Sequence, residues 1–263
     1  MNDFIKVEKD GIVFYKSEKL EGCDFFKYLF TTRIGGVSEG ENYSLNLGIN
    51  KEKKENVIEN FRRVCDLIDA DIDDMFVLKQ IHTDNVHELK TGDKSLIYNT
   101  EDRAYADGVI SNIKGRGFGV FCADCVPVIL ADNKKKVVAA VHSGWRSTAM
   151  HIAKKAAEKM IDKYGCDAKD ILVAIGPSIQ KCCFEVDSDA ADKFDEKYRK
   201  KKSEKFIIDL QKVIKDDLMS VGIVGSNISD SEICTKCNSG EFFSSRAQKG
   251  KHGLMMALVK VRD

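Results

Sequence analysis

The pattern of apolar and polar positions along the chain predicts strands and helices in irregular alternation. Residues 4–15 contain two short apolar stretches on either side of Asp10-Gly11, a pair common in tight turns, which predicts a hairpin. Longer apolar runs predict further strand regions. They cover residues 75–81, 117–132 with Pro127 as an interruption, 137–142, 171–177 and 253–261.

Helical spacing of apolar residues is clearest in residues 53–68. The apolar face there consists of Val57, Phe61, Val64, Cys65 and Ile68. A second helix is expected after Ser143-Gly144. Its apolar face would carry Ile152, Ala156 and Met160. We expect further helices near 187–198 and 209–220, and a solvated helix end and loop in the basic run 196–205.

This order of elements favours an α+β fold with mixed β-sheets over a doubly wound parallel sheet. No internal repeat, low-complexity linker or Pro/Gly/Ser-rich boundary divides the chain, so we expect one domain over residues 1–263. The glycine-rich motifs of dinucleotide-binding folds and P-loops are missing from the sequence. The pattern therefore gives no support to a nucleotide-cofactor fold.

The charges of the chain balance, with 42 Lys and Arg against 42 Asp and Glu. A balanced chain has no dominant field, which argues against a nucleic-acid or polyanion binder. The apolar fraction of 43% supports a sizeable core, and no apolar run approaches the roughly 18 residues of a membrane span. The first residues contain no signal-peptide apolar region, so we expect a cytoplasmic protein without membrane partners. The sequence predicts no oligomeric state.

Nine cysteines and five histidines are the inventory that could carry chemistry. An odd number of cysteines cannot pair completely within one chain, and a reducing compartment favours free thiols. His82, Cys125 and His142 each lie at or near the end of a predicted strand, where side chains can converge on a pocket. One thiolate and two imidazoles form a good zinc site with a fourth position open for catalysis. The alternative is a core thiol with two hydrogen-bonded histidines.

A rival metal site could combine two C-x-x-C pairs into a four-thiolate zinc site. The pairs are Cys122 with Cys125 and Cys234 with Cys237. The gap between them far exceeds that of common zinc motifs, and positions three apart on a strand face opposite sides. The adjacent Cys182 and Cys183 are expected to be ordinary thiols.

Several basic and acidic residues beside turns are candidates for holding a substrate. Arg33 adjoins a Gly-Gly turn, Arg146 enters a predicted helix N-terminus, and Arg246 lies among small residues, so each could bind an anion. Asp107 and Asp124 are candidate proton carriers. The alternative for these residues is a surface arginine or a turn-capping carboxylate.

Seven segments occur in an order that resembles a known family. They read TTRIGGVSEGENYSLNLG, QIHTDNVH, ADGVISN, ADCVPVILAD, AAVHSGWRST, IGPSIQKCCFEV and ICTKC..GEFFSSR. Together they resemble the YfiH family, also called the laccase-domain or multicopper polyphenol oxidase family, from about residue 28 to the C-terminus. The HT..V, DC.P and VH.GWR blocks are the most specific.

The resemblance implies a fold and a metal. Members of the family have a four-layer α-β-β-α sandwich and bind zinc through residues that correspond to His82, Cys125 and His142. Copper could substitute for zinc, because N/S sites favour it thermodynamically. A laccase needs several copper ions and many histidine ligands, so five histidines fit the oxidase label poorly.

The resemblance also implies an activity. Family members cleave adenosine, inosine, guanosine and methylthioadenosine by phosphorolysis and deaminate adenosine to inosine. We therefore expect a zinc-dependent purine nucleoside phosphorylase with adenosine deaminase activity, whose partners are a nucleoside and phosphate. Bacterial members are linked to peptidoglycan-precursor editing, so a hydrolase with the same zinc centre is the alternative. A zinc-stabilised binding protein and a copper polyphenol oxidase are less favoured.

The expected site combines these two lines of argument. The three zinc ligands and Asp124 form the catalytic set. Substrate or phosphate contacts are expected from Arg33, Ser44, Asn46, Arg62, Arg63, Arg146 and Arg246. Near the C-terminus the chain departs from the family's usual segment at Ala247, His252 and Leu254, which puts substrate roles there in doubt. His252 is expected in an exposed loop, with a place near the pocket as the alternative.

Overall fold

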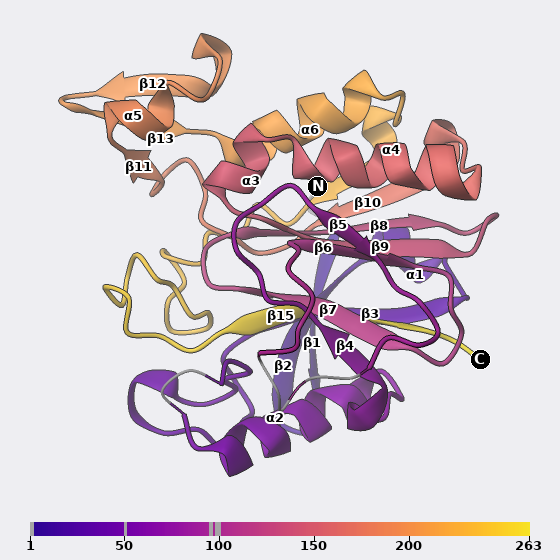
Figure 1. Ribbon diagram of the computed structural model, residues 1–263. Coiled ribbons are helices and arrows are strands. Elements are labelled where there is room, and N and C mark those ends of the chain that lie inside the picture. The colour runs from indigo at the N-terminus through magenta and orange to yellow at the C-terminus, as the bar shows by residue number, and fades with distance from the viewer. Residues whose placement is uncertain (1–2, 50–51, 95–96, 98–100) are drawn as a thin grey trace.

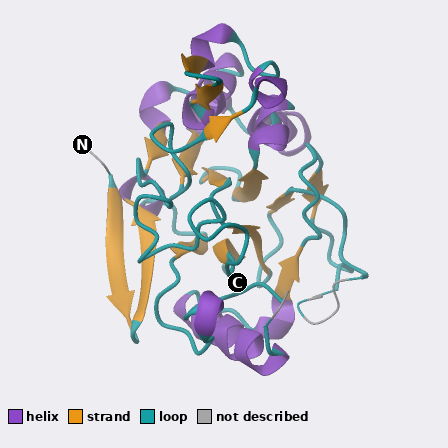
Figure 2. Cartoon of the chain, turned by 90° about the vertical axis from the view of Figure 1, so that its left-hand side faces the viewer, coloured by secondary structure: helices purple, strands orange, loops and turns teal. Residues whose placement is uncertain are grey.

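The structure, a computed structural model, describes residues 3–49, 52–94, 97 and 101–263. Within these residues two six-stranded sheets lie face to face, and helices cover the outer side of each (Figure 1). Figure 2 shows the same layers from the side, with helices at both ends of the molecule and strands between them. The expected α-β-β-α sandwich with mixed sheets is confirmed.

The first sheet has the strand order β1-β2-β3-β15-β7-β4. In that order its strands span Phe4–Lys9, Ile12–Ser17, Phe26–Thr31, Met255–Val261, Gly117–Cys122 and Met75–Val77. Only the β4–β7 pair is parallel. Helix α2 (Lys54–Leu67) covers the outer face, where its buried Val57, Phe61 and Val64 pack against the sheet.

The second sheet has the strand order β14-β10-β8-β9-β6-β5. In that order its strands span Ile228–Asp230, Ile171–Ile175, Val126–Asp132, Val137–Ser143, Gly108–Ser111 and Val86–Glu88. Three helices cover its outer face (Figure 1). They are α3 (Trp145–Ala149), α4 (Ile152–Tyr164) and α6 (Leu210–Ser220).

Smaller elements lie at the margins of this sandwich. A three-stranded sheet with the order β11-β13-β12 projects with α5 beyond α3 (Figure 1). Its strands span Glu185–Val186, Lys205–Ile208 and Arg199–Lys202, and α5 spans Ser188–Ala191. A short helix α1 (Glu18–Glu21) follows β2.

The core explains why strands β8 and β9 are apolar along their whole length. Successive side chains of a strand point to opposite faces of its sheet. On β8, Ile129 and Ala131 face the layer between the two sheets, whereas Val128 and Leu130 face the helices. Both faces are buried, so the strand lacks the alternation of a half-exposed one.

Most elements expected from the pattern are confirmed. These are the hairpin at 4–15, the helices at 53–68, after 143–144 and at 209–220, and the strands at 137–142, 171–177 and 253–261. Two regions differ.

Strand β4 ends at Val77, four residues before the predicted end of the 75–81 strand. The side chain of Gln80 replaces the main chain there: its Nε2 donates to Phe121 O at 2.9 Å, and its Oε1 accepts from Phe121 N at 2.6 Å. The amide side chain of Gln80 thus satisfies the main-chain N–H and C=O of Phe121, near the end of β7. The main chain after β4 can therefore leave the sheet and turn towards His82.

The helix expected at 187–198 and the helix end and loop expected at 196–205 are wrong. Helix α5 ends at Ala191, and Asp195 has an extended backbone with ψ of 152°. Strand β12 then takes up the basic run and pairs with β13, whose Phe206 and Ile208 supply the apolar residues that a hairpin needs. The lysines of β12 are exposed in this strand, as they would be on the surface of a helix. Their polar character therefore did not indicate which of the two elements forms.

Among the described residues, no helix combines the length and apolar character that crossing a membrane requires.

The layer between the sheets should dominate stability. Phe118 on β7 is fully buried there, at 0% exposure. We expect Phe118→Ala to lower the free energy of unfolding by about 3–5 kcal/mol, because it leaves a cavity between two rigid sheets. Urea denaturation measures the effect. The matched control is Ile5→Ala on β1, where 40% exposure predicts a change within about 0.5 kcal/mol. Equal effects of the two substitutions would contradict this view of the core.

Candidate metal centre and its cavity

Two histidines and one cysteine from separate strand ends meet at one point. His82 lies in the loop after β4, Cys125 directly precedes β8, and His142 is the second-last residue of β9. One ligand atom of each lies within 4.8 Å of those of the other two, and the two imidazole centroids are 5.0 Å apart. The structure thus brings together the three residues that the sequence singled out.

The register of the second sheet places two of these residues side by side. Strands β8 and β9 are antiparallel, and Pro127 pairs with His142 while Val126 pairs with Ser143. Cys125 therefore leaves the sheet beside the end of β9. Gly144 is the first residue after β9. A Cβ at this position would lie 2.6 Å from His82 Nδ1 and 3.2 Å from Cys125 Sγ. Only glycine leaves room for the imidazole and the thiol to approach each other there.

The buried carboxylate of Asp107 orients both histidines. Asp107 lies directly before β6, and its Oδ1 is 2.8 Å from His142 Nδ1. Three main-chain N–H groups donate to the same carboxylate, those of Ile81 at 3.2 Å, His82 at 3.1 Å and Thr83 at 2.7 Å. Because Nδ1 of His142 is engaged, its Nε2 is left for a metal.

The charges of the site act on each histidine differently. Burial acts to lower the pKa of His142, but the Cys125 thiolate and the Asp107 carboxylate outweigh it and raise that pKa to about 9. Burial and the charges of His142 and Arg146 lower the pKa of His82. Burial acts to raise the pKa of Asp107, yet the hydrogen bonds from His142 and from main-chain N–H groups lower it, so the carboxylate stays charged.

The donor set fits a borderline-soft divalent ion. A thiolate and two imidazoles suit zinc and also copper, and Asp107 supplies the outer hydrogen bond that metal-bound histidines usually make. Three protein ligands leave a further coordination position, which is typical of catalytic zinc.

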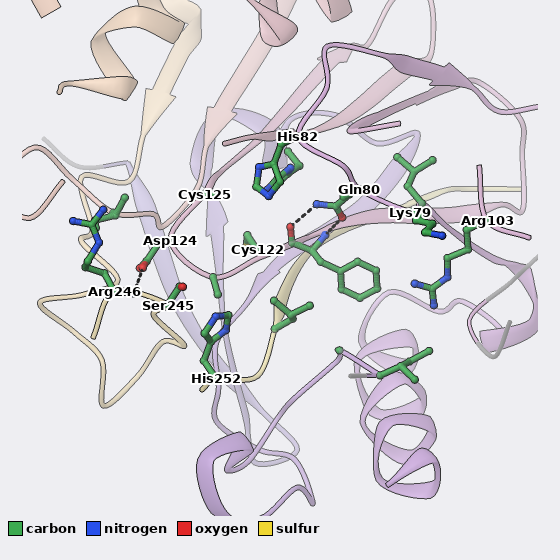
Figure 3. Close-up of a pocket in the computed structure, with 18 of the residues that line it drawn as sticks. Lys79, Gln80, His82, Arg103, Cys122, Asp124, Cys125, Ser245, Arg246 and His252 are labelled. Atoms are coloured by element: carbon green, nitrogen blue, oxygen red, sulfur yellow. Dashed lines mark hydrogen bonds between the residues drawn. The ribbon is translucent and has the colours of Figure 1, made fainter. Parts of the chain in front are cut away.

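The group lies on the wall of a cavity of about 640 Å³ (Figure 3). Phe121, Phe184 and Leu254 contribute apolar wall, and charged side chains lie at two ends. Lys79 and Arg103 are together on one side, and Arg246 lies on the other, next to Asp124 (Figure 3). A cavity of this size and character suits a small organic ligand. The ligand could carry an anionic group itself, or bind together with a separate anion.

Comparison with known proteins identifies the family. The family described as multi-copper polyphenol oxidoreductase laccase matches residues 27–262. The chain belongs to this family.

Curated relatives of this laccase-family chain carry enzyme names. It is 32% identical to a purine nucleoside phosphorylase of Clostridium acetobutylicum over 97% of each sequence. It is 31% identical to purine nucleoside phosphorylase LACC1 of Mus musculus, covering 91% of this chain but only 56% of the mouse protein. It is 30% identical to adenosine deaminase RL5 of an unknown prokaryotic organism, over 87% of this chain and 93% of that protein.

Two solved structures share the whole laccase-family fold. They are the hypothetical protein YfiH of Bacillus licheniformis, 29% identical, and YlmD of Geobacillus stearothermophilus, 26% identical. Each matches with a TM-score of 0.92 over 100% of both chains.

Two of the other residues proposed from the sequence line the cavity. Asp124, with φ of 85°, accepts hydrogen bonds from Thr235 Oγ1 at 2.6 Å and from the main-chain N of Arg246 at 2.7 Å. Both carboxylate oxygens are engaged, so Asp124 braces the loop before β15 against the cavity wall. The Arg246 guanidinium donates to Glu185 O at 2.8 Å and packs over Phe184.

The remaining predicted contacts lie outside the cavity lining. They are Arg33, Ser44, Asn46, Arg62, Arg63 and Arg146. Ser44 and Asn46 are buried and bond to main-chain groups, as with Ser44 Oγ and Gly35 N at 3.1 Å or Asn46 Oδ1 and Leu254 N at 2.8 Å. Arg146 is exposed and stacks on Trp145, although its charge reaches His82.

Two arginines of this set serve the loop around Gly35-Gly36. Arg33 donates to Tyr43 O at 2.7 Å and Ser239 O at 3.0 Å, and Arg63 on α2 donates to Gly35 O at 3.1 Å. Arg62 is exposed on α2. The Gly-Gly turn that marked Arg33 therefore reports on local backbone structure.

Sequence reasoning missed three polar cavity residues. Gln80 is the first residue of the QIHTDNVH block and Lys79 directly precedes it, so their place at a motif was a usable signal. Arg103 is buried, and burial lowers its pKa to about 10, but nothing in its sequence context marks it. His252 lines the cavity, which is the alternative and not the exposed loop that was expected.

The rival combination of C-x-x-C pairs is not assembled. Cys122 is buried at the end of β7, and Cys125 belongs to the histidine site. Cys182 and Cys183, expected to be ordinary thiols, are free but have further thiols beside them. They lie in a second group with Cys234 and Cys237.

The outer hydrogen bond to His142 should set metal affinity. We expect Asp107→Asn to weaken binding of zinc by about 10- to 100-fold, because the amide no longer stabilises the charge on the ligand imidazole. Competition with a chromophoric chelator measures the affinity.

A matched control exists on the same sheet. His87 Nε2 lies 2.7 Å from Asp93 Oδ2, so Asp93→Asn removes a similar carboxylate–imidazole contact away from the three ligands. Zinc affinity should stay unchanged in that variant. An unchanged affinity in Asp107→Asn would contradict the assigned role.

Proposed function

We propose that the chain is a zinc-dependent purine nucleoside phosphorylase that also deaminates adenosine. The observation that carries this proposal is the placement of His82, Cys125 and His142 on the wall of a cavity of about 640 Å³. Relatives at about 30% identity named for these two activities support it. Adenosine, inosine, guanosine and methylthioadenosine are the proposed substrates.

The cavity offers complementary surfaces for a nucleoside and phosphate. Aromatic and aliphatic wall residues such as Phe121 and Leu254 can pack against a purine ring, which has two apolar faces. Cationic groups on either side of the cavity can hold an anion: Lys79 and Arg103 on one side and Arg246 on the other. His252 adds an imidazole to the cavity wall.

The donor chemistry supports zinc as the resident ion. When bound, zinc supplies a Lewis acid that polarises oxygen groups of water or substrate. Asp107 holds the His142 ring in place, and the apolar wall limits access of bulk water. Copper could occupy the same donors, because such sites favour it thermodynamically.

The multicopper oxidase chemistry named in the family description fits this chain poorly. Several copper ions need many histidines, and the chain has five in all. Two of these are His87, paired with Asp93, and His151, paired with Asp217 on the surface. Too few remain for a multinuclear copper cluster.

In phosphorolysis a phosphate oxygen bonds to the anomeric carbon of the ribose as the bond to the purine nitrogen breaks. The products are the free base and ribose 1-phosphate. Arg246 would orient the phosphate and offset its charge as the two reactants approach. In deamination, water replaces the amino group at purine C6 and ammonia leaves, so phosphate is not needed.

One assay tests the proposal. Protein of known metal content is incubated with adenosine, with and without phosphate, and adenine, inosine and hypoxanthine are resolved by chromatography. Adenine that forms only with phosphate supports phosphorolysis, and inosine supports deamination. No product from any nucleoside would favour an editing hydrolase on peptidoglycan precursors, which would use the same ligands. Activity that tracks copper content and oxidises phenols would favour an oxidase.

Loss of one ligand should remove metal and turnover together. We expect His82→Ala and Cys125→Ala to lose the zinc of the histidine site and both activities, since two donors hold zinc weakly. Metal analysis and the nucleoside assay report the two losses. His151→Ala is the control, because that histidine is exposed and pairs only with Asp217 among the described residues. Full turnover by a variant that no longer holds zinc at the histidine site would contradict the proposal.

A second substitution separates the two activities. We expect Arg246→Ala to raise the KM for phosphate by about 10- to 100-fold through loss of a charge-assisted hydrogen bond. Deamination should be affected far less, because it uses no phosphate. Arg62→Ala, on the exposed face of α2, is the control and should leave both activities unchanged. The reverse pattern would move the phosphate site to α2.

A further inference from the structure

Four cysteines from two loops gather at one point outside the cavity lining. They are Cys182, Cys183, Cys234 and Cys237, here called the four-cysteine cluster. All four sulfur atoms lie within 4.8 Å of one another. The first pair lies in the turn after β10, and the second pair lies in the loop after β14 that leads to β15 (yellow in Figure 1).

The sulfur spacing matches a tetrahedral metal site. Zinc bonds sulfur at about 2.3 Å, which places the sulfurs of a tetrahedron about 3.8 Å apart. Cys237 Sγ lies 3.8 Å from Cys182 Sγ and 3.4 Å from Cys183 Sγ. The sulfur of Cys237 therefore lies close to two other sulfurs, whereas a disulfide would join it to one sulfur at about 2.05 Å. All four cysteines are free.

The chemistry of the cluster favours a borderline-soft metal ion at its centre. Its four side chains all offer sulfur. Sulfur donors suit zinc, and a thiol binds such an ion as the thiolate.

We propose that the four-cysteine cluster binds one zinc ion in a tetrahedral four-thiolate site, separate from the histidine site. Binding releases the thiol protons to solvent and forms four zinc–sulfur bonds, with no change of oxidation state. The resulting complex carries two negative charges, and Lys181 and Lys236 adjoin it in the sequence. Four protein ligands close the coordination sphere, so this zinc is structural.

The zinc joins two loops that together form part of the cavity wall. Ile179 and Phe184 flank the first cysteine pair, and Ser245 and Arg246 follow the second. Thr235 lies between Cys234 and Cys237 in the sequence, and its hydroxyl donates to the carboxylate of Asp124. Asp124 directly precedes Cys125, a ligand of the histidine site, in the sequence. The structural zinc therefore holds the wall beside the histidine site. It does not depend on which reaction that site performs.

Zinc stoichiometry tests the proposal on the full chain, purified under reducing conditions. We expect about two zinc ions per wild-type chain and about one in Cys182→Ser/Cys237→Ser, whose side chains are exposed and should not disturb the core. His82→Ala/His142→Ala should also keep about one, held by the four-cysteine cluster. Cys23→Ser, a buried cysteine of neither group, should keep both. Circular dichroism checks that each variant is folded.

Cobalt substitution provides a readout besides metal content and activity. Thiolate-to-cobalt charge-transfer absorption should persist in His82→Ala/His142→Ala, with the intensity of a four-thiolate site, and should fall to that of one thiolate in Cys182→Ser/Cys237→Ser. This arm uses an intact four-cysteine cluster, so it stands even where the cysteine variant folds poorly.

Three results would overturn the proposal. These are an unchanged zinc count in the double cysteine variant, bound iron in place of zinc, and disulfides among the four cysteines in freshly reduced protein. Failure of the nucleoside proposal has a different signature, since it would leave the zinc of the four-cysteine cluster in place.

Discussion

The buried carboxylate of Asp107 is the contact on which the candidate site depends. It accepts main-chain hydrogen bonds from residues 81–83 and holds the ring of His142. The main-chain O of Asp107 also accepts from His142 N at 2.7 Å, so one residue fixes both the backbone and the imidazole of this ligand. A buried charge is tolerable only when it is fully hydrogen-bonded, and this one is satisfied almost entirely by groups of the candidate site. The geometry of the two histidines is therefore tied to the folding of the second sheet.

The sandwich supplies rigidity, and the loops at one edge supply the chemistry. Strands β8 and β9 are buried on both faces, which leaves Cys125 and His142 little freedom to move. The opposite wall comes from loops, and loops need other means of being held. Gln80 fastens one loop to β7, and Asp124 fastens another through Thr235 and Arg246. A metal in the four-cysteine cluster would add a third fastening, at the margin of the core where Cys234 is buried and Cys182 and Cys237 are exposed.

The cavity wall carries positive charges although the chain as a whole has no net charge. Lys79, Arg103 and Arg246 line a space that also contains the thiol and imidazole groups. Single cations placed around an apolar cavity attract a small anion without giving the surface a net field. This distribution agrees with the balanced composition and with a small-molecule substrate.

The apolar pattern was enough to predict an α+β fold with mixed sheets, and the family resemblance added the four layers and the three converging residues. Apolar periodicity predicts most strands and helices because each element must bury one face or both, and ordered motifs marked His82, Cys125 and His142. Local signals failed where side chains act across the fold. The Gly-Gly turn suggested an anion site at Arg33, but the Arg33 side chain donates to main-chain O atoms of Tyr43 and Ser239. Arg63, also expected to contact phosphate, donates to Gly35 O. The sequence pattern of the basic run at 196–205 fits a strand and a helix equally well, because its lysines are exposed to solvent in either.

Only the tertiary structure decided which distant residues share a site. Arg103 reaches the cavity without any motif, and Cys182 and Cys183 join Cys234 and Cys237 across about 50 residues of chain, a separation that no local spacing rule covers. The physical reason is that cavity walls and metal sites are built from strand ends and loops, whose meeting is set by sheet register. Register depends on the packing of the whole core, which periodicity in one segment does not contain.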